Sequence, residues 1–183
     1  LNFGVLYGMS VFGFSESAGI EREEAKKFIN EYMEKFSGVA RYIRETKEIV
    51  KNNLYVETEL GRRRYIPEIN SPNFQVANAA ERMAVNMPIQ GMTADIMKLA
   101  MIKIQEYFKS NSDTHPVKSG EARAEQFNGV KMILQIHDEI IFEVKEEIAE
   151  EVGKKVKEIM ENVYKLKVPL IAQIKSGDSW GEI

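Results

Sequence analysis

Residues 131–144 have the sequence KMILQIHDEIIFEV, and they decide the fold. Two short runs rich in β-branched and aromatic residues flank three polar ones, His137, Asp138 and Glu139. Runs of this length and composition predict strands, and a short polar break between two strands predicts a hairpin turn. Two acids would then lie at the tip of a largely apolar hairpin.

The role of the acids at this tip has two possible interpretations. A carboxylate is costly to bury unless it is paired or binds a metal, and Mg²⁺ prefers oxygen ligands. Asp138, together with Glu139, is therefore a candidate ligand for a hard divalent cation. The alternative is a solvent-exposed turn in which Asp138 only caps the backbone. The tripeptide by itself leaves both readings open.

The composition excludes several classes of protein. The chain has 183 residues and 44% hydrophobic content, enough for one sizeable core or two small ones. A net charge of −3 argues against a wholly basic nucleic-acid coat protein but allows a local basic surface. There are no cysteines, which excludes disulfides, thiolate zinc sites and cysteine nucleophiles. No apolar run approaches the length of a membrane span, so we expect no membrane partner.

The first ten residues, LNFGVLYGMS, begin abruptly in apolar sequence and lack the basic region of a signal peptide. We therefore expect upstream residues to be missing. The segment predicts the end of a helix that Gly8 terminates. Phe3 and Tyr7 are four residues apart and would share a face, either as an ordinary aromatic stripe or as a platform for a base.

Two amphipathic helices are predicted next, at residues 21–36 and 39–52, and we expect both to be scaffold. Residues 55–60 alternate like a half-buried strand, and a turn at Gly61 leads into three consecutive arginines at 62–64. Such a cluster either binds phosphate or is a solvated charge run.

A longer helix is predicted from about residue 74 to about residue 108, with its cap at residues 71–73. We expect an interruption near Pro88 and Gly91, because a proline removes a backbone hydrogen bond. The part after the break has the apolar residues of a core helix.

One face of this helix has unusual chemistry. Arg82, Asn86 and Gln90 recur every four residues and so project from nearly one side. Arginine and the amides suit phosphate and base-edge contacts, which favours a binding face.

The remaining segments complete an α+β pattern. Residues 109–128 are polar and predict a surface loop, residues 146–164 predict an amphipathic helix, and residues 168–175 predict a last strand. Helices followed by mixed strands and helices indicate an α+β fold with an antiparallel sheet.

Four segments together resemble family A DNA polymerases of the bacterial DNA polymerase I type. In the family's order and approximate separation, they are NFGVLYG at 2–8, GRRRYIP at 61–67, AAERMAVNMPIQGMTADIMKLAM at 79–101 and QIHDEIIFEV at 135–144. The resemblance covers essentially the whole chain except the 109–128 loop. That loop looks longer than is usual in the family, and is either an insertion with its own contact or tolerated surface.

The resemblance implies the distal part of a fingers subdomain at residues 1–50 and most of a palm subdomain at residues 51–183. It implies a cytoplasmic DNA-directed DNA polymerase of replication and repair, with primer–template DNA and a deoxynucleotide (dNTP) as partners and Mg²⁺ as cofactor. In the family, the primer 3′-hydroxyl attacks the α-phosphate of the dNTP in line, and two Mg²⁺ ions stabilise the attacking and leaving oxygens.

The resemblance also implies roles for the hairpin residues. Asp138 matches the palm aspartate that holds the catalytic metal ions, and Glu139 matches the acid beside it. His137 and Gln135 match residues near the primer terminus.

Other roles fall on the earlier segments. Tyr7 matches the tyrosine that closes the fingers helix and guards the template-base position, and Phe3 matches the aromatic beside the incoming sugar. Arg82, Asn86 and Gln90 match residues that face the primer–template and the active site. The arginines at 62–64 receive no specific role.

The chain departs from the family pattern upstream. It has no counterpart of the family's second metal-binding aspartate, of the arginine and lysine that bind the triphosphate, or of the thumb. We therefore expect the chain alone neither to polymerise DNA nor to hold a stable metal. Its N-terminal complement, in the same or a separate polypeptide, is an expected partner.

Two other classes remain open. A single-subunit RNA polymerase also has a His-Asp pair at a palm hairpin, although Glu139 and the AERMAVNMPIQG segment favour the DNA enzyme. A non-catalytic nucleic-acid-binding module would fit the missing upstream acid. The joint presence of Asp138, Glu139, Tyr7 and Arg82 argues against it.

Overall fold

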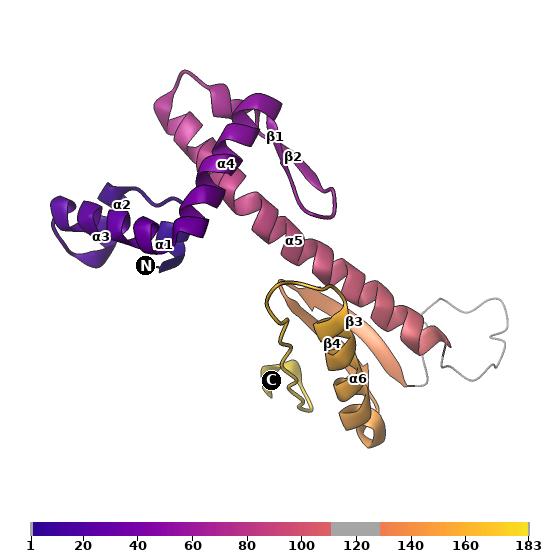
Figure 1. The fold of residues 1–183 in the computed structure, drawn as a ribbon. Helices are drawn as coiled ribbons and strands as arrows, with labels where there is room; N and C mark the ends of the chain where they lie inside the picture. The colour runs from indigo at the N-terminus through magenta and orange to yellow at the C-terminus, as the bar shows by residue number, and fades with distance from the viewer. Residues whose placement is uncertain (1, 111–128, 183) are drawn as a thin grey trace. The chain divides into compact units, whose positions relative to one another are not determined.

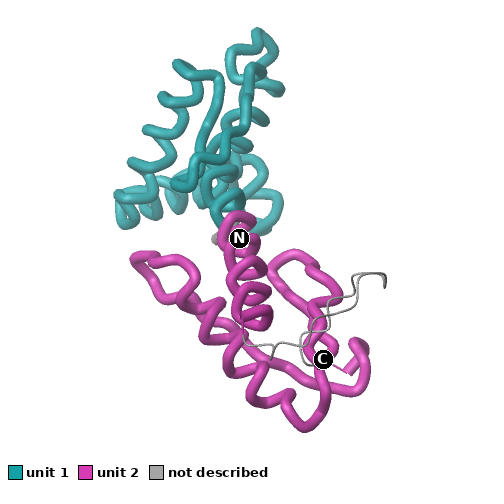
Figure 2. The backbone as a smooth tube through the Cα atoms, turned by 90° about the vertical axis from the view of Figure 1, so that its right-hand side faces the viewer, with its two compact units in different colours: residues 1–92 teal, residues 93–183 magenta. Residues whose placement is uncertain are grey.

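The computed structural model describes residues 2–110 and 129–182, with side chains from residue 4 onward. The chain divides into two compact units, Leu1–Met92 and Thr93–Ile183, shown in different colours in Figure 2. The fold is α+β, with two separate two-stranded antiparallel sheets among the helices (Figure 1). None of the helices in the described ranges is both long and apolar enough to cross a membrane.

The first unit begins with four helices: α1 (Asn2–Leu6), α2 (Val11–Ala18), α3 (Arg22–Lys35) and α4 (Ser37–Asn53). The predicted helices at 21–36 and 39–52 are confirmed, as is the stop at Gly8, whose φ of +80° favours glycine. Helix α2 was not predicted. It is capped at its start by Ser10, whose hydroxyl accepts a hydrogen bond from the Gly13 N–H at 3.1 Å.

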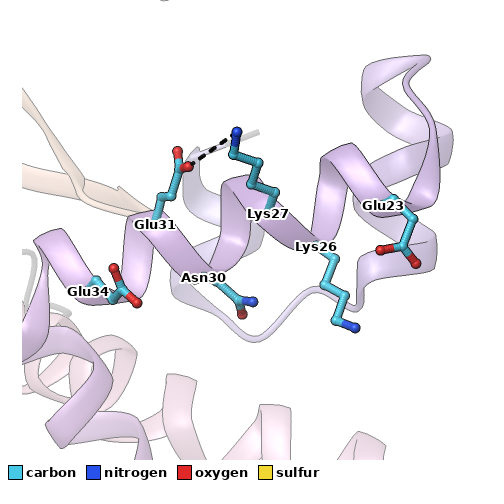
Figure 3. A pocket seen from close by; sticks show the side chains of 6 residues that line it. All are labelled: Glu23, Lys26, Lys27, Asn30, Glu31 and Glu34. Carbon is cyan, nitrogen blue, oxygen red and sulfur yellow. Dashed lines mark ion pairs between the residues drawn. The ribbon is translucent and has the colours of Figure 1, made fainter.

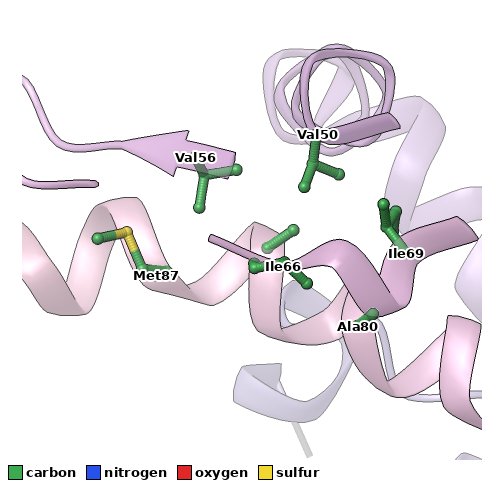
Figure 4. Close-up of a cluster of buried hydrophobic side chains, with 7 residues drawn as sticks. Val50, Val56, Ile66, Ile69, Ala80 and Met87 are labelled. Atoms are coloured by element: carbon green, nitrogen blue, oxygen red, sulfur yellow. The ribbon is translucent and has the colours of Figure 1, made fainter. Parts of the chain in front are cut away.

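A hairpin and a buried cluster follow in the first unit. Strands β1 (Tyr55–Glu57) and β2 (Arg63–Tyr65) pair antiparallel on either side of the predicted turn at Gly61. Strand β1 is shorter than the strand predicted at 55–60, and β2 was not predicted. A short 3-10 helix, η1 (Pro67–Asn70), comes next. The cluster in Figure 4 joins α4, the hairpin, η1 and the following helix, and consists of Val50, Val56, Ile66, Ile69, Ala80, Ala84 and Met87.

Helix α5 (Phe74–Ser110) continues through the predicted interruption, so that prediction was wrong. Pro88 lies inside the helix, where it removes a single backbone donor. Ala84 and Met87 are buried on the core side of this stretch, and their packing outweighs the one lost hydrogen bond. The predicted cap is confirmed, because Asn73 Oδ1 accepts a hydrogen bond from the Gln75 N–H at 2.9 Å.

The second unit contains the predicted hairpin of residues 131–144, with strands β3 (Val130–Ile136) and β4 (Glu139–Val144). The predicted helix at 146–164 is also present, as η2 (Glu146–Ile148) and α6 (Ala149–Asn162). The core of this unit lies between α5, the hairpin and α6, and includes Ala100, Ile104, Val130, Val152, Val156 and Val163. The predicted loop lies largely outside the described residues, which end at Ser110 and resume at Gly129.

Strand β3 contains one residue that has no pairing partner in β4. Val130 pairs with Val144 and Met132 with Phe142, whereas beyond the irregularity Leu134 pairs with Ile141. Ile133 is therefore the extra residue of a β-bulge. The bulge lets Met132 and Phe142 face the core together while the far end of the hairpin closes in a two-residue turn.

The strand predicted at 168–175 does not form, although these residues are described. The segment is instead held against α6 by side chains. Glu161 Oε1 accepts a hydrogen bond from the Ala172 N–H at 3.0 Å, and a Cβ added to Gly153 would meet Ile174 Cγ2 at 3.2 Å. An alternating pattern forms a strand only where another strand pairs with it, and neither sheet of the described residues includes this segment.

Candidate active site

The acidic tip of the β3–β4 hairpin is formed by the two-residue turn His137-Asp138, with Glu139 as the first residue of β4. His137 has a φ of +51°, which few non-glycine residues adopt. A positive φ at the first turn residue matches the twist of a tight hairpin. The side chains of all three residues are exposed, so the cost of burying a carboxylate does not argue for a metal here.

Gln135 lies beside this turn. Its Nε2 donates a hydrogen bond to the carbonyl oxygen of His137 at 2.6 Å. Gln135 pairs across the hairpin with Ile140, which packs against the core of the second unit. Paired residues share a face, so Gln135 is an exposed polar residue at the end of the core-facing side.

The acids at the tip fit part of a Mg²⁺ site. Within the described residues, the side chains of Asp138 and Glu139 make no hydrogen bond or ion pair, so their carboxylate oxygens are available to a cation. Over the same ranges, no three His, Cys, Asp or Glu side chains lie close enough together to hold a metal. Mg²⁺ usually takes one or two carboxylates and fills its remaining positions with water and substrate phosphates. The two acids therefore suit such a site without completing it.

The first unit brings together two candidate residues that are distant in sequence. A Cβ added to Gly8 would lie 3.5 Å from Arg82 Cγ, so the turn after α1 packs against α5 at Arg82. Tyr7, which precedes that glycine, is half-buried, and Arg82 is exposed. The side chain of Phe3 lies outside the described part of the chain.

Tyr42 is a neighbour of Tyr7 that the sequence did not single out. Its hydroxyl donates a hydrogen bond to the Val85 carbonyl oxygen at 2.8 Å, which fastens α4 to α5 one residue before Asn86. Burial raises the pKa of Tyr42, a hydrogen bond with Thr46 lowers it, and the nearby Tyr7 adds to the rise. A tyrosine in an amphipathic helix is ordinary, so no signal in the sequence marked this residue.

Asn86 and Gln90 continue the face that begins at Arg82. Gln90 is exposed, whereas Asn86 is half-buried. Asn86 Oδ1 is buried and has no hydrogen-bond partner among the described atoms. An unsatisfied buried acceptor is destabilising, and a ligand that supplied a donor would remove that penalty.

The β1–β2 hairpin approaches α5 next to Gln90. A Cβ added to Gly91 would lie 2.6 Å from Thr58 Cγ2 and 3.7 Å from Arg62 Cδ. Only a residue without a side chain permits this approach. Gly91 therefore marks a packing contact where the sequence suggested a helix break.

One arginine of the 62–64 cluster interacts with other side chains of the β1–β2 hairpin. Arg63 Nε donates a hydrogen bond to Glu57 Oε2, and its guanidinium lies 4.7 Å from the centre of the Tyr55 ring. The hydrogen bond that Arg63 donates to Glu57 raises the pKa of Arg63. For this arginine the structure favours a role in the hairpin over a role in phosphate binding.

The pocket in Figure 3 carries none of the candidate residues. Its lining comes from α3 alone and consists of Glu23, Lys26, Lys27, Asn30, Glu31 and Glu34. Lys27 and Glu31 form an ion pair one helical turn apart, at 3.9 Å. A hollow between the side chains of a single helix is a surface feature and suggests no chemistry.

The candidate residues therefore form two groups. Tyr7, Arg82, Asn86 and Gln90 belong to the first unit, and Gln135, His137, Asp138 and Glu139 belong to the second. The family model of DNA polymerase family A matches residues 1–182. The chain belongs to DNA polymerase family A.

Individual relatives agree with this assignment. The chain is 44% identical over 182 residues to the thermostable DNA polymerase I of Thermus filiformis, covering 100% of this chain and 20% of that protein. It is 45% identical over 183 residues to DNA polymerase I of Borreliella burgdorferi, covering 100% of this chain and 18% of that protein. The chain thus spans about a fifth of the length of these relatives.

A solved structure is similar to the fold as well as to the sequence. It is the POL domain of Pol1 from M. smegmatis in complex with DNA primer-template and dNTP. The match has a TM-score of 0.79 at 40% identity, and covers 92% of this chain and 27% of that chain.

Proposed function

We propose that the protein containing this chain is a DNA-directed DNA polymerase that extends a primer 3′-hydroxyl with dNTPs in DNA replication and repair. The observation that carries the proposal is the family A match over residues 1–182. The similar POL domain was solved with primer-template DNA and dNTP, which supports the same partners here. A cytoplasmic location accompanies this function.

Asp138 and Glu139 are the residues proposed to hold Mg²⁺. When bound, the metal would stabilise charge on the reacting phosphate oxygens. The chain contributes two exposed carboxylates on a tight turn, free of internal ion pairs within the described residues. No side-chain rearrangement is needed to make these oxygens available.

The other candidates are proposed to bind the substrates. Arg82 suits a phosphate, because a guanidinium pairs with phosphate oxygens through two parallel hydrogen bonds. Asn86 and Gln90 suit base or sugar edges, and Gln135 and His137 would lie near the primer terminus. Tyr7, with Phe3, is assigned to the template base and the incoming nucleotide. The contact between Gly8 and Arg82 supports this, because it places Tyr7 close to a proposed DNA-binding side chain.

The subdomain assignment, fingers at 1–50 and palm at 51–183, is part of the same proposal. So is the expectation that the isolated chain is inactive and needs the N-terminal part of the polymerase. Two adjacent carboxylates supply too few ligands for a complete Mg²⁺ site, which supports this expectation.

Primer extension with Mg²⁺ and four dNTPs tests the proposal. It would compare residues 1–183 alone with the product of the complete reading frame that carries this sequence. We expect extension only by the complete product, and a loss on the order of 10²-fold or more in Asp138→Ala. Asp178→Ala is a matched control, because Asp178 is also an exposed aspartate and lies outside the proposed site.

Other outcomes would point to the remaining classes. Efficient extension with ribonucleotides would favour an RNA polymerase relative, although the family A match argues against it. Binding of primer–template by the complete product without any extension would favour a non-catalytic module. Extension by residues 1–183 alone would refute the expected need for the N-terminal part.

A further inference from the structure

The turn that carries Asp138 contains a backbone conformation that is uncommon outside glycine. His137 has a φ of +51°, a region that glycine adopts readily and that only a few per cent of non-glycine residues adopt. The turn is also exposed, so core packing does not hold it. A turn of this kind persists only where surrounding contacts fix it.

The Gln135 side chain supplies such a contact. Its Nε2 donates to the His137 carbonyl oxygen at 2.6 Å, a short bond that spans only two residues of chain. The pairing of Gln135 with Ile140, next to the pair Ile136 and Glu139 that closes the two-residue turn, places the amide beside the turn. Local strand geometry therefore aims this side chain.

The hydrogen bond acts on Asp138 through one peptide plane. The His137 carbonyl oxygen and the backbone nitrogen and Cα of Asp138 belong to the same planar unit. Fixing the direction of that carbonyl therefore fixes where the Asp138 side chain begins. Because a carbonyl oxygen only accepts, Nε2 is the amide atom that faces it, and Oε1 remains available as an acceptor for another group.

We propose that Gln135 is a positioning residue that holds the His137-Asp138 turn and thereby aims the Asp138 carboxylate. This role rests on the proposed polymerase function. It differs from the contact with the primer terminus that family resemblance suggests for Gln135, because it acts through Asp138 and is made without DNA.

The test uses the product of the complete reading frame and compares Gln135→Met with Glu143→Gln. Methionine keeps the length of the side chain and removes the donor. Glu143→Gln is a matched control, because Glu143 accepts a hydrogen bond from Lys131 Nζ at 2.6 Å in the same hairpin, away from the turn. Two properties are measured: backbone hydrogen–deuterium exchange of the peptide containing the turn, and the steady-state kinetics of primer extension.

A positioning role predicts faster exchange at the turn in Gln135→Met but not in Glu143→Gln. It also predicts that Gln135→Met lowers kcat by roughly 10- to 100-fold and raises the Mg²⁺ concentration needed for half-maximal rate. Losing a residue that orients Asp138 changes kcat and the Mg²⁺ dependence, whereas losing a DNA contact weakens DNA affinity.

The remaining outcomes count against the proposal. Unchanged exchange would show that the bond does not hold the turn. Faster exchange with unchanged Mg²⁺ dependence would show a structural role without positioning of Asp138. Weaker DNA binding alone would assign Gln135 to the primer contact only. A wild-type protein that extends no primer would refute the proposed function and this role together, whereas active wild type with unchanged variants would refute this role alone.

Discussion

Replacing Gly91 with alanine is the sharpest test of how α5 meets the β1–β2 hairpin. In an exposed helix the change is favourable, because alanine is about 1 kcal/mol better than glycine at an interior position. Here the added Cβ would lie 2.6 Å from Thr58 Cγ2 and 3.4 Å from Met87 Cε. The first distance is far inside ordinary van der Waals contact.

The neighbour has little freedom to move away. Thr58 is buried, its N–H donates to the Arg62 carbonyl oxygen at 2.9 Å, and its Oγ1 accepts from the Arg62 N–H at 3.1 Å. Overpacking of this kind costs about 1–3 kcal/mol. After the helix gain of about 1 kcal/mol is subtracted, we expect Gly91→Ala to lower the free energy of unfolding by about 1 kcal/mol.

Urea unfolding followed by circular dichroism measures this difference. Gly38→Ala is the control, because Gly38 is also helical but a Cβ added there would meet no atom within 4 Å. This substitution should leave the free energy of unfolding unchanged or raise it. Thr58→Ser removes Cγ2 and keeps the hydroxyl. In that background, Gly91→Ala should become stabilising by up to about 1 kcal/mol. If Gly91→Ala stabilises the unmodified chain as much as Gly38→Ala does, the close approach does not exist and the reasoning fails.

Two further substitutions test the contact between α4 and α5. Burial favours a higher pKa for Glu81, but Lys47 at 2.7 Å and Lys51 at 3.1 Å outweigh it and lower that pKa. Glu81→Gln should therefore lower stability by about 1 kcal/mol at neutral pH, with the difference from wild type vanishing as pH falls through the folded-state pKa; urea titrations over acidic pH measure this. Tyr42→Phe removes the hydroxyl bound to Val85 and should also lower stability by about 1 kcal/mol at neutral pH. Because the pKa of Tyr42 is raised, wild type should lose that advantage as pH rises through the folded-state value, and thermal unfolding at alkaline pH checks it.

The outcomes that contradict these expectations differ. A Glu81→Gln penalty that persists unchanged in acid would assign the effect to packing rather than to charge. An alkaline loss of stability that is as large in Tyr42→Phe as in wild type would assign that loss to another group.

Local features of the fold followed from the sequence because they depend on near neighbours. The apolar runs on either side of His137, the glycine stop at Gly8 and the cap at Asn73 were all found where the chain pattern placed them. Each depends on residues only a few positions apart. The same locality makes the exposed acids at the hairpin tip recognisable without any knowledge of the rest of the fold.

The sequence-based predictions failed where contacts between residues distant in the chain determine the local structure. The pattern at 168–175 lacked a pairing strand, and Glu161 binds the segment from α6 instead. The expected break at Pro88 does not occur, because residues from α4 and the first hairpin bury that part of α5. The roles of Tyr42 and Gly91 depend on contacts across the first unit, which no spacing in the sequence records.

The bulge at Ile133 has a consequence for engineering. The pairs on the two sides of it are each in register, so deleting that single residue would join them into one regular ladder with the same two-residue turn. A bulge bends its strand and increases the local twist, and the deletion would remove both effects. Shortening β3 by one residue is therefore a way to flatten the hairpin while every side chain at its acidic end keeps its identity and its cross-strand partner.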